Sequence, residues 1–156
     1  MVGMYMNRIR IVAATLGFAL VTVAGAEEST SVFDQEIARF QRLAASKHAE
    51  LRVEAAQGFK YLKHHSGEAV LLPLVRDGDL TVRLETVKAL EVCGRRRSIG
   101  ALIDSLSDTE WEVRTRAHIA LRHMTAQDIP ADAGDKWRTW LTGTNWTAKE
   151  DALLRI

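Results

Sequence analysis

Cysteine is almost absent from this sequence, which has one in 156 residues, together with two prolines and 6% aromatic residues. The lone Cys93 cannot form an internal disulfide, so the hydrophobic core has to stabilise the fold by itself. An excess of charge of either sign is also missing, because 21 Lys and Arg face 20 Asp and Glu. A chain this close to neutral has no overall electrostatic reason to bind nucleic acid.

Motifs that carry catalysis are missing as well. Gly94 and Gly100 flank a run of arginines without the strand, loop and helix of a phosphate-binding site, and no nucleophile elbow is present. The histidines stand at no recognised metal-ligand spacing; they are His48, His64, His65, His118 and His123. We therefore expect no enzyme activity, no cofactor and no metal site.

The first 26 residues have the composition of a signal peptide. Arg8 and Arg10 precede an uncharged apolar run, and Ala24-Gly25-Ala26 places small residues where a signal peptidase cleaves. The apolar run over 11–26 is 16 residues long, shorter than the about 20 that span a bilayer, which makes a retained membrane anchor the weaker alternative. We predict export to the periplasm or the exterior, with cleavage after Ala26. The mature chain would then hold 19 basic and 20 acidic residues, since only Arg8 and Arg10 are lost.

The remainder of the chain repeats with a period of 31 residues. The equivalent positions are Arg52, Arg83 and Arg114; Asp77 and Asp108; Val82 and Val113; Ala89 and Ala120; and Phe59, Leu90 and Leu121. Within a unit, apolar residues recur at steps of three and four, which indicates amphipathic helices. Shorter partner helices are predicted near residues 33–45, where Phe33 should lie on the apolar face, and near 69–76 and 99–106. Pro73 should kink the second of them.

A helical hairpin of this size cannot bury its apolar face alone, so the repeat predicts stacked hairpins. The expected fold is all-α: a short right-handed α-solenoid of about three units, closed by a C-terminal capping helix. We assign residues 1–26 to the signal peptide, 27–131 to the repeat domain and 132–156 to capping helices. Trp137, Trp140 and Leu141 should share the face that covers the last unit. Residues 147–150 resemble a capping box for a further short helix.

One motif recurs in two consecutive units: an Asp, then Val-Arg five residues later, then Ala-Leu. It is present as Asp77, Val82-Arg83 and Ala89-Leu90, and again as Asp108, Val113-Arg114 and Ala120-Leu121. These residues resemble the short HEAT-like repeats of the phycobilisome-lyase type, which form an armadillo-like superhelix, over residues 33–124. The resemblance implies a scaffold role without lyase activity. It also implies a polar ladder made by Asp77, Arg83, Asp108 and Arg114.

The repeat register predicts two edges of opposite charge. Arg95, Arg96 and Arg97 align with the turn that contains Lys63, His64 and His65, and the other turns carry Asp77, Asp79, Asp108, Glu110 and Glu112. Exposed turns are commonly charged for solubility alone. The functional interpretation is a protein partner with an acidic surface, which binds Lys63 and the three arginines or the adjoining concave face of the short helices.

Three functions are compatible with these features. The first is an exported, non-enzymatic scaffold that binds another protein and makes no membrane contact once the signal peptide is cleaved. The second is an accessory protein, similar to a lyase or chaperone, that holds a cofactor-bearing protein substrate; an exposed Cys93 would favour it. Cys93 aligns with Leu62 and Met124, however, so we expect it to be buried. The third is self-association through an open end of the stack.

Overall fold

Residues 31–146 are described by the computed structural model, and in this range the chain forms seven α-helices and two short 3₁₀ turns. In chain order the elements are α1 (Val32–Ala44), α2 (Ala49–Leu62), η1 (His65–Gly67), α3 (Glu68–Leu71), η2 (Leu72–Arg76), α4 (Leu80–Cys93), α5 (Arg96–Ser105), α6 (Trp111–Thr125) and α7 (Gly134–Gly143). The predicted signal peptide and the capping box at 147–150 lie outside the described residues. Between residues 31 and 146 no helix combines the length and the apolar character needed to cross a membrane.

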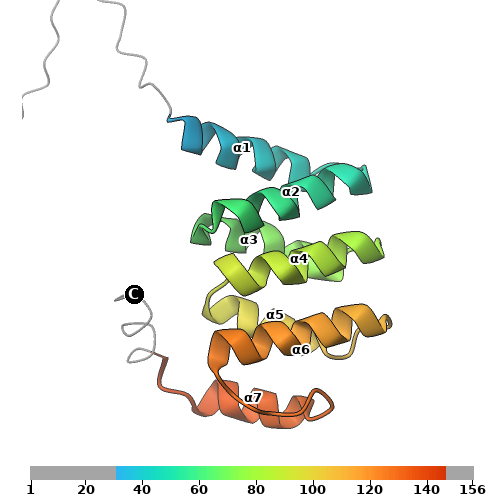
Figure 1. Ribbon diagram of the computed structural model, residues 1–156, viewed down its shortest axis with the longest axis vertical. Coiled ribbons are helices and arrows are strands. Elements are labelled where there is room, and N and C mark those ends of the chain that lie inside the picture. The colour runs from blue at the N-terminus through green and yellow to red at the C-terminus, as the bar shows by residue number, and fades with distance from the viewer. Residues whose placement is uncertain (1–30, 147–156) are drawn as a thin grey trace, which may run out of the picture.

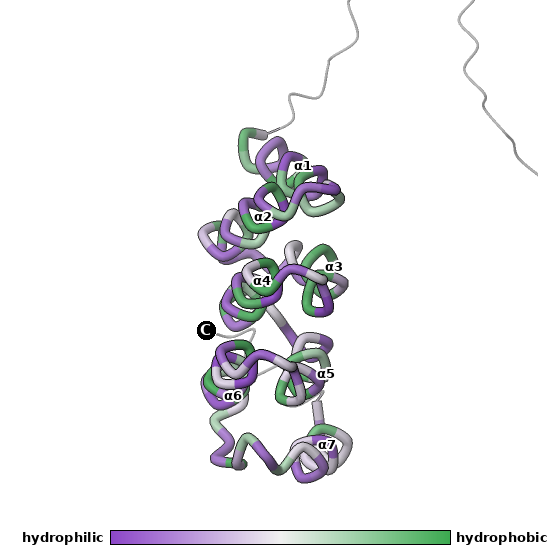
Figure 2. Tube along the Cα trace, turned by 90° about the vertical axis from the view of Figure 1, so that its right-hand side faces the viewer, coloured by the Kyte–Doolittle hydropathy of each residue, from purple (hydrophilic) through white to green (hydrophobic). Residues whose placement is uncertain are grey.

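The helices stack in two layers (Figure 1). One layer contains the long helices α2, α4 and α6, and α4 contacts both of the others. The second layer contains α3 with η2, then α5, then α7, which packs against α5, while α1 closes the stack against α2 (Figure 2). Each helical pair thus buries its apolar side against the next pair, and the predicted all-α solenoid is confirmed.

The core runs continuously along the stack between the layers. Phe59, Leu90 and Leu121, which the repeat makes equivalent, are all fully buried. The smaller buried residues of the long helices follow the same period; they are Ala55, Ala56, Val82, Ala89, Val113, Ala117 and Ala120. The register predicted from the sequence is therefore correct in all three units.

The first pair of helices lacks most of the motif but keeps the packing. A Cβ atom at Gly58 would lie 2.4 Å from the ring of Phe40, so only glycine lets α1 approach α2 this closely. Phe40 in turn meets the Phe59 ring edge-on at 5.7 Å. These contacts pack α1 closely against α2.

The disruption predicted at Pro73 is present: the short helix is divided into α3 and the 3₁₀ turn η2, because proline has no N–H for a continuing helix. Two other predicted details differ in the structure. Helix α5 begins at Arg96 instead of near Ile99, since the Glu68 side chain accepts hydrogen bonds from the N–H groups of Arg95 and Ser98. Phe33 is 41% exposed instead of buried, because α1 ends the stack and has neighbours on one side only.

Candidate protein-binding surfaces

Arginine and aspartate side chains link successive units along one edge of the stack. Arg52 donates from Nε and Nη2 to the carboxylate of Asp77, at 2.6 and 2.8 Å, and from Nη1 to the Ser46 carbonyl at 2.9 Å. Arg83 repeats this pattern one unit later, at 2.9 and 3.0 Å from the Asp108 carboxylate and 2.9 Å from the Asp77 carbonyl. Each such pair is a rung, and we name this side, formed by the turns 46–48, 77–79 and 108–110, the ladder edge.

The aspartates of the two rungs remain ionised in the fold. The hydrogen bond from Arg52 lowers the pKa of Asp77 and outweighs the opposing effect of burial. Burial opposes ionisation of Asp108, but the hydrogen bonds from Arg83 and from the Glu110 N–H bring its pKa below the usual value. Because donor and acceptor are both charged and mostly covered, each rung fixes the spacing between neighbouring units.

Arg114, the third arginine of the series, has a different environment. Its Nη1 donates to the carbonyls of Asp108 and Thr109, at 2.7 and 2.8 Å, as in the earlier units. Within residues 31–146, however, Arg114 forms no ion pair. The residue 31 positions after Asp108 is Thr139 in α7, and its hydroxyl donates to the Asp135 carbonyl. The predicted ladder residue Arg114 therefore has an open position where a carboxylate would bind.

The comparison with protein families agrees with this geometry. The family model for HEAT repeats matches residues 38–124, which is more than half of the chain and includes both rungs. The chain belongs to the HEAT-repeat family. HEAT repeats generally act as protein-binding scaffolds and are typically not catalytic. The comparison with curated proteins finds no match.

The opposite side of the HEAT-repeat stack carries the predicted basic residues. Lys63 and Arg95 are exposed in the turns that follow α2 and α4, and Arg96 and Arg97 are exposed in the first turn of α5. We name this side the basic edge; it lies where α2 and α4 end in Figure 1. Arg96 lies over the Trp146 ring at 5.5 Å, whereas Arg95 and Arg97 form no ion pair within the described part of the chain. Two guanidinium groups are therefore available to a partner.

A single carboxylate in the described residues is hydrogen-bonded into the basic edge. Glu68 accepts from the Arg95 N–H at 2.8 Å and from the Ser98 N–H and hydroxyl at 3.1 and 2.8 Å, so it caps α5. Desolvation lowers the pKa of His65, and the neighbouring His64 and Arg95 act in the same direction. At neutral pH the positive charge of this edge thus comes from lysine and arginine.

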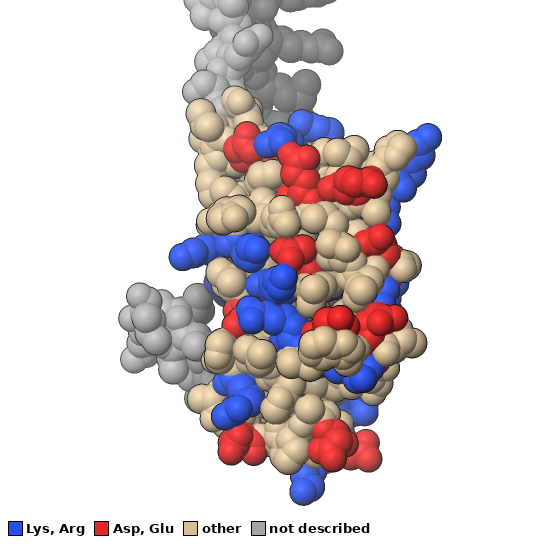
Figure 3. Space-filling model, turned by 45° about the vertical axis from the view of Figure 1, so that its right-hand side comes forward, with Lys and Arg blue, Asp and Glu red and all other residues tan. Residues whose placement is uncertain are grey.

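A second set of ion pairs crosses the long helices, and the sequence analysis missed it. Lys60 of α2 pairs with Glu85 of α4 at 3.2 Å, and the equivalent positions one unit later hold Glu91 and Arg116, paired with the charges exchanged. Burial opposes ionisation of Glu85, but hydrogen bonds from Lys88 and Lys60 lower its pKa. The separation of 25 residues, shared with the ladder, could have revealed these pairs. Acidic and basic side chains accordingly interleave on the face in Figure 3.

Exposed apolar residues follow the repeat too. Tyr61 and Val92 are equivalent, lie just before the basic turns, and are 77% and 43% exposed. At the ladder edge the equivalent residues Leu80 and Trp111 begin α4 and α6, and Trp111 is 62% exposed. None of these four residues was predicted from the sequence to lie at a binding surface. Each edge therefore combines charge with apolar surface, a composition found at protein interfaces.

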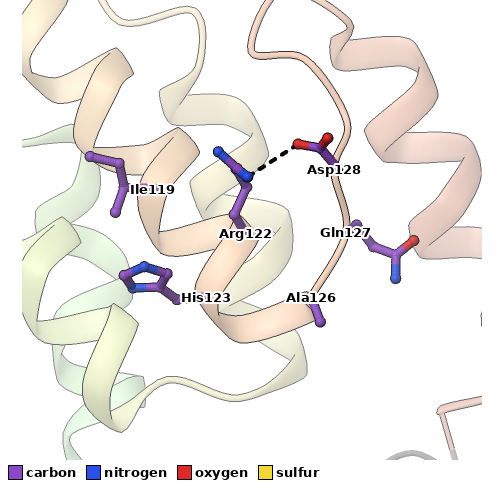
Figure 4. Close-up of a pocket in the computed structure, with 6 residues that line it drawn as sticks. All are labelled: Ile119, Arg122, His123, Ala126, Gln127 and Asp128. Atoms are coloured by element: carbon purple, nitrogen blue, oxygen red, sulfur yellow. Dashed lines mark ion pairs between the residues drawn. The ribbon is translucent and has the colours of Figure 1, made fainter.

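A shallow hollow of about 350 Å³ lies at the end of α6 (Figure 4). Arg122 on the helix forms an ion pair with Asp128 on the following segment at 3.3 Å, and His123 contacts Glu91 of α4. The remaining lining residues are Ile119, Ala126 and Gln127. Each ionisable group of the hollow thus has a partner, but the pair of Arg122 with Asp128 is exposed to solvent and contributes little stability.

His118 and Cys93 have structural contacts. His118 lies beside the core, with Nε2 2.9 Å from the Ile129 carbonyl, and no group of three possible metal ligands occurs within residues 31–146. Cys93 is buried, as predicted, and its thiol donates to the Ala89 carbonyl at 3.0 Å. Burial raises the pKa of this thiol to about 11. A thiol with these properties is a poor nucleophile.

Proposed function

We propose that this HEAT-repeat domain is an exported, non-enzymatic scaffold that binds an acidic surface of another protein through its basic edge. The observation that carries the proposal is the exposure of Lys63 and the three consecutive arginines beside the apolar side chains of Tyr61 and Val92. Cations supply attraction and orientation toward carboxylates, and the apolar neighbours supply area that excludes water.

The burial of Cys93 weighs against the alternative of a lyase-like accessory protein. A protein that transfers or holds a cofactor through a thiol needs that thiol at the surface and readily ionised, and Cys93 is neither. The scaffold function needs no reactive group. It is therefore the better supported of the two.

The test is crosslinking and co-purification of the mature protein from its own envelope or secretion fraction. The variant Arg95→Glu, Arg96→Glu, Arg97→Glu should lose the acidic proteins that the unmodified protein retains, and rising salt should weaken their capture. A matched control reverses Arg42, Lys47 and Lys136, which are exposed and form no ion pair among the described residues. Equal capture by both variants, each with an unchanged circular dichroism spectrum, would show that the basic edge is not the binding surface.

A further inference from the structure

The Arg114 side chain is oriented to bind a carboxylate, but no carboxylate within residues 31–146 pairs with it. Its Nη1 is held against the Asp108 and Thr109 carbonyls, as the Nη1 of Arg83 is held against the carbonyl of Asp77. In Arg52 and Arg83 the same hydrogen bond from Nη1 orients the guanidinium group so that Nε and Nη2 both donate to one carboxylate. A guanidinium that is already oriented loses less entropy when it forms a bidentate pair.

The path of the chain after α6 explains why this position stays open. Residues 126–133 form a non-helical segment, without the short helix of the earlier units, that leads to α7. Neither of its aspartates pairs with Arg114, since Asp128 pairs with Arg122 and Asp132 forms no ion pair among the described residues. α7 packs on α5, and the segment contacts the middle of α6, where His118 Nε2 lies 2.9 Å from the Ile129 carbonyl. The first turn of α6, with Trp111 and Arg114, lies beyond that contact, and Trp111 remains 62% exposed.

We propose that Arg114 and Trp111 form a docking site for an aspartate or glutamate side chain of another protein, presented as Asp77 and Asp108 are presented within the stack. The carboxylate pairs with Nε and Nη2 of Arg114, and the neighbouring part of the partner covers Trp111. Residues at positions i and i+3 of a helix share a face, which places the two side chains in one contact. This site is on the ladder edge and is independent of the basic edge.

A second copy of this chain does not satisfy the site by continuing the stack. The position equivalent to Asp77 in the first unit is Ser46, which has no carboxylate. Charge complementarity therefore favours a different protein. Glu110 and Glu112 lie near Arg114 in sequence. The earlier rung also has a second acidic residue nearby, because the charge of Glu110 acts on Arg83, and Arg83 still pairs with Asp108. A nearby carboxylate does not prevent pairing at this edge.

The probe for the test is a synthetic peptide with the sequence of residues 106–124, which contains the Asp108 turn and the start of a helix. It is titrated into the isotope-labelled full chain, and the side-chain NMR signals of Arg114 Nε and Trp111 Nε1 are followed. We expect saturable shifts of both signals. Changing Asp108→Asn in the peptide, or Arg114→Gln in the protein, should raise the Kd about tenfold, the loss expected for a charge-assisted bidentate pair.

The matched control protein is Arg42→Gln, which alters an exposed arginine at the other end of the stack and should bind the peptide like the unmodified chain. Unshifted Arg114 and Trp111 signals, or equal affinity for the unmodified peptide and its Asp108→Asn variant, would overturn the proposal. So would a large gain in peptide affinity on changing Glu150→Gln and Asp151→Asn, because the chain's own C-terminal segment would then occupy the site. Loss of binding in the Arg95→Glu, Arg96→Glu, Arg97→Glu variant would place the peptide on the basic edge and would also count against the proposal.

Discussion

Arg83 and Arg114 occupy equivalent positions in successive units, but their surroundings differ. Both donate from Nη1 to a carbonyl of the turn before their own helix. Arg83 also forms two hydrogen bonds with Asp108, whereas Arg114 forms no ion pair within residues 31–146. The motif therefore orients the arginine within its own unit, and the carboxylate comes from the next unit. Within residues 31–146, the stack consequently ends with an arginine that is oriented for a carboxylate but has none.

The largest effect is expected in the middle of the stack, where both faces of a unit are covered. Leu90→Ala should lower the free energy of unfolding by about 2–5 kcal/mol, because Leu90 is fully buried in α4 between α2 and α6. Chemical denaturation followed by circular dichroism measures the change. Val92→Ala, in the same helix but exposed, is the control and should stay within about 0.5 kcal/mol. A similar small value for Leu90→Ala would mean that the repeat register is wrong.

The next effect concerns a single rung. Asp108→Asn should lower the free energy of unfolding by about 1–3 kcal/mol at neutral pH, since it leaves the mostly covered guanidinium of Arg83 without its ionised partner. Thermal and denaturant unfolding measure the loss.

The pH dependence of this difference is an internal control. The folded pKa of Asp108 is below its usual value of 3.8, so its stabilising contribution is fully present above that value and disappears as the pH falls through the folded pKa. The unmodified protein and the Asp108→Asn variant should therefore converge in stability under acid conditions. A difference that stays constant down to low pH would show that the ionised pair is not its cause.

The smallest effect is expected at the open end. Arg114→Gln should lower the free energy of unfolding by about 0.5–1.5 kcal/mol, because it removes the hydrogen bonds from Nη1 to the Asp108 and Thr109 carbonyls but no ion pair. Arg83→Gln is the matched substitution and should destabilise the protein clearly more in the same denaturation experiment. If the two variants were equally destabilised, Arg114 would have a partner in the folded chain, and the contrast between the middle and the end of the stack would not hold.

The sequence was sufficient to predict the architecture because each unit buries the same apolar positions against its neighbours. A period of 31 residues made Phe59, Leu90 and Leu121 equivalent, and all three are buried. The motif around Val82-Arg83 indicated the HEAT-repeat family, which the family comparison confirms. The start of α5 could not be predicted in the same way, since it depends on Glu68, which lies 27 residues before Arg95 and caps the helix. Local propensity does not include such a contact.

The choice between a paired and an unpaired arginine also lies outside the local sequence. The period alone assigns the same role to Arg52, Arg83 and Arg114, and only the path of residues 126–133 leaves the last of them open. The exposure of Trp111 and the exchanged charges of Lys60–Glu85 and Glu91–Arg116 depend likewise on which helix lies alongside.

The amino-acid sequence by itself determined the helices, their pairing and the buried stripe, because apolar periodicity and repeat length act within and between adjacent units. Only the tertiary structure decided where the stack ends and which charges remain without a partner. The physical reason is that a helix and its buried face follow from residues close together in sequence. An ion pair instead requires side chains from different units to lie within contact distance, and for Arg114 the path of the chain after α6 decides this.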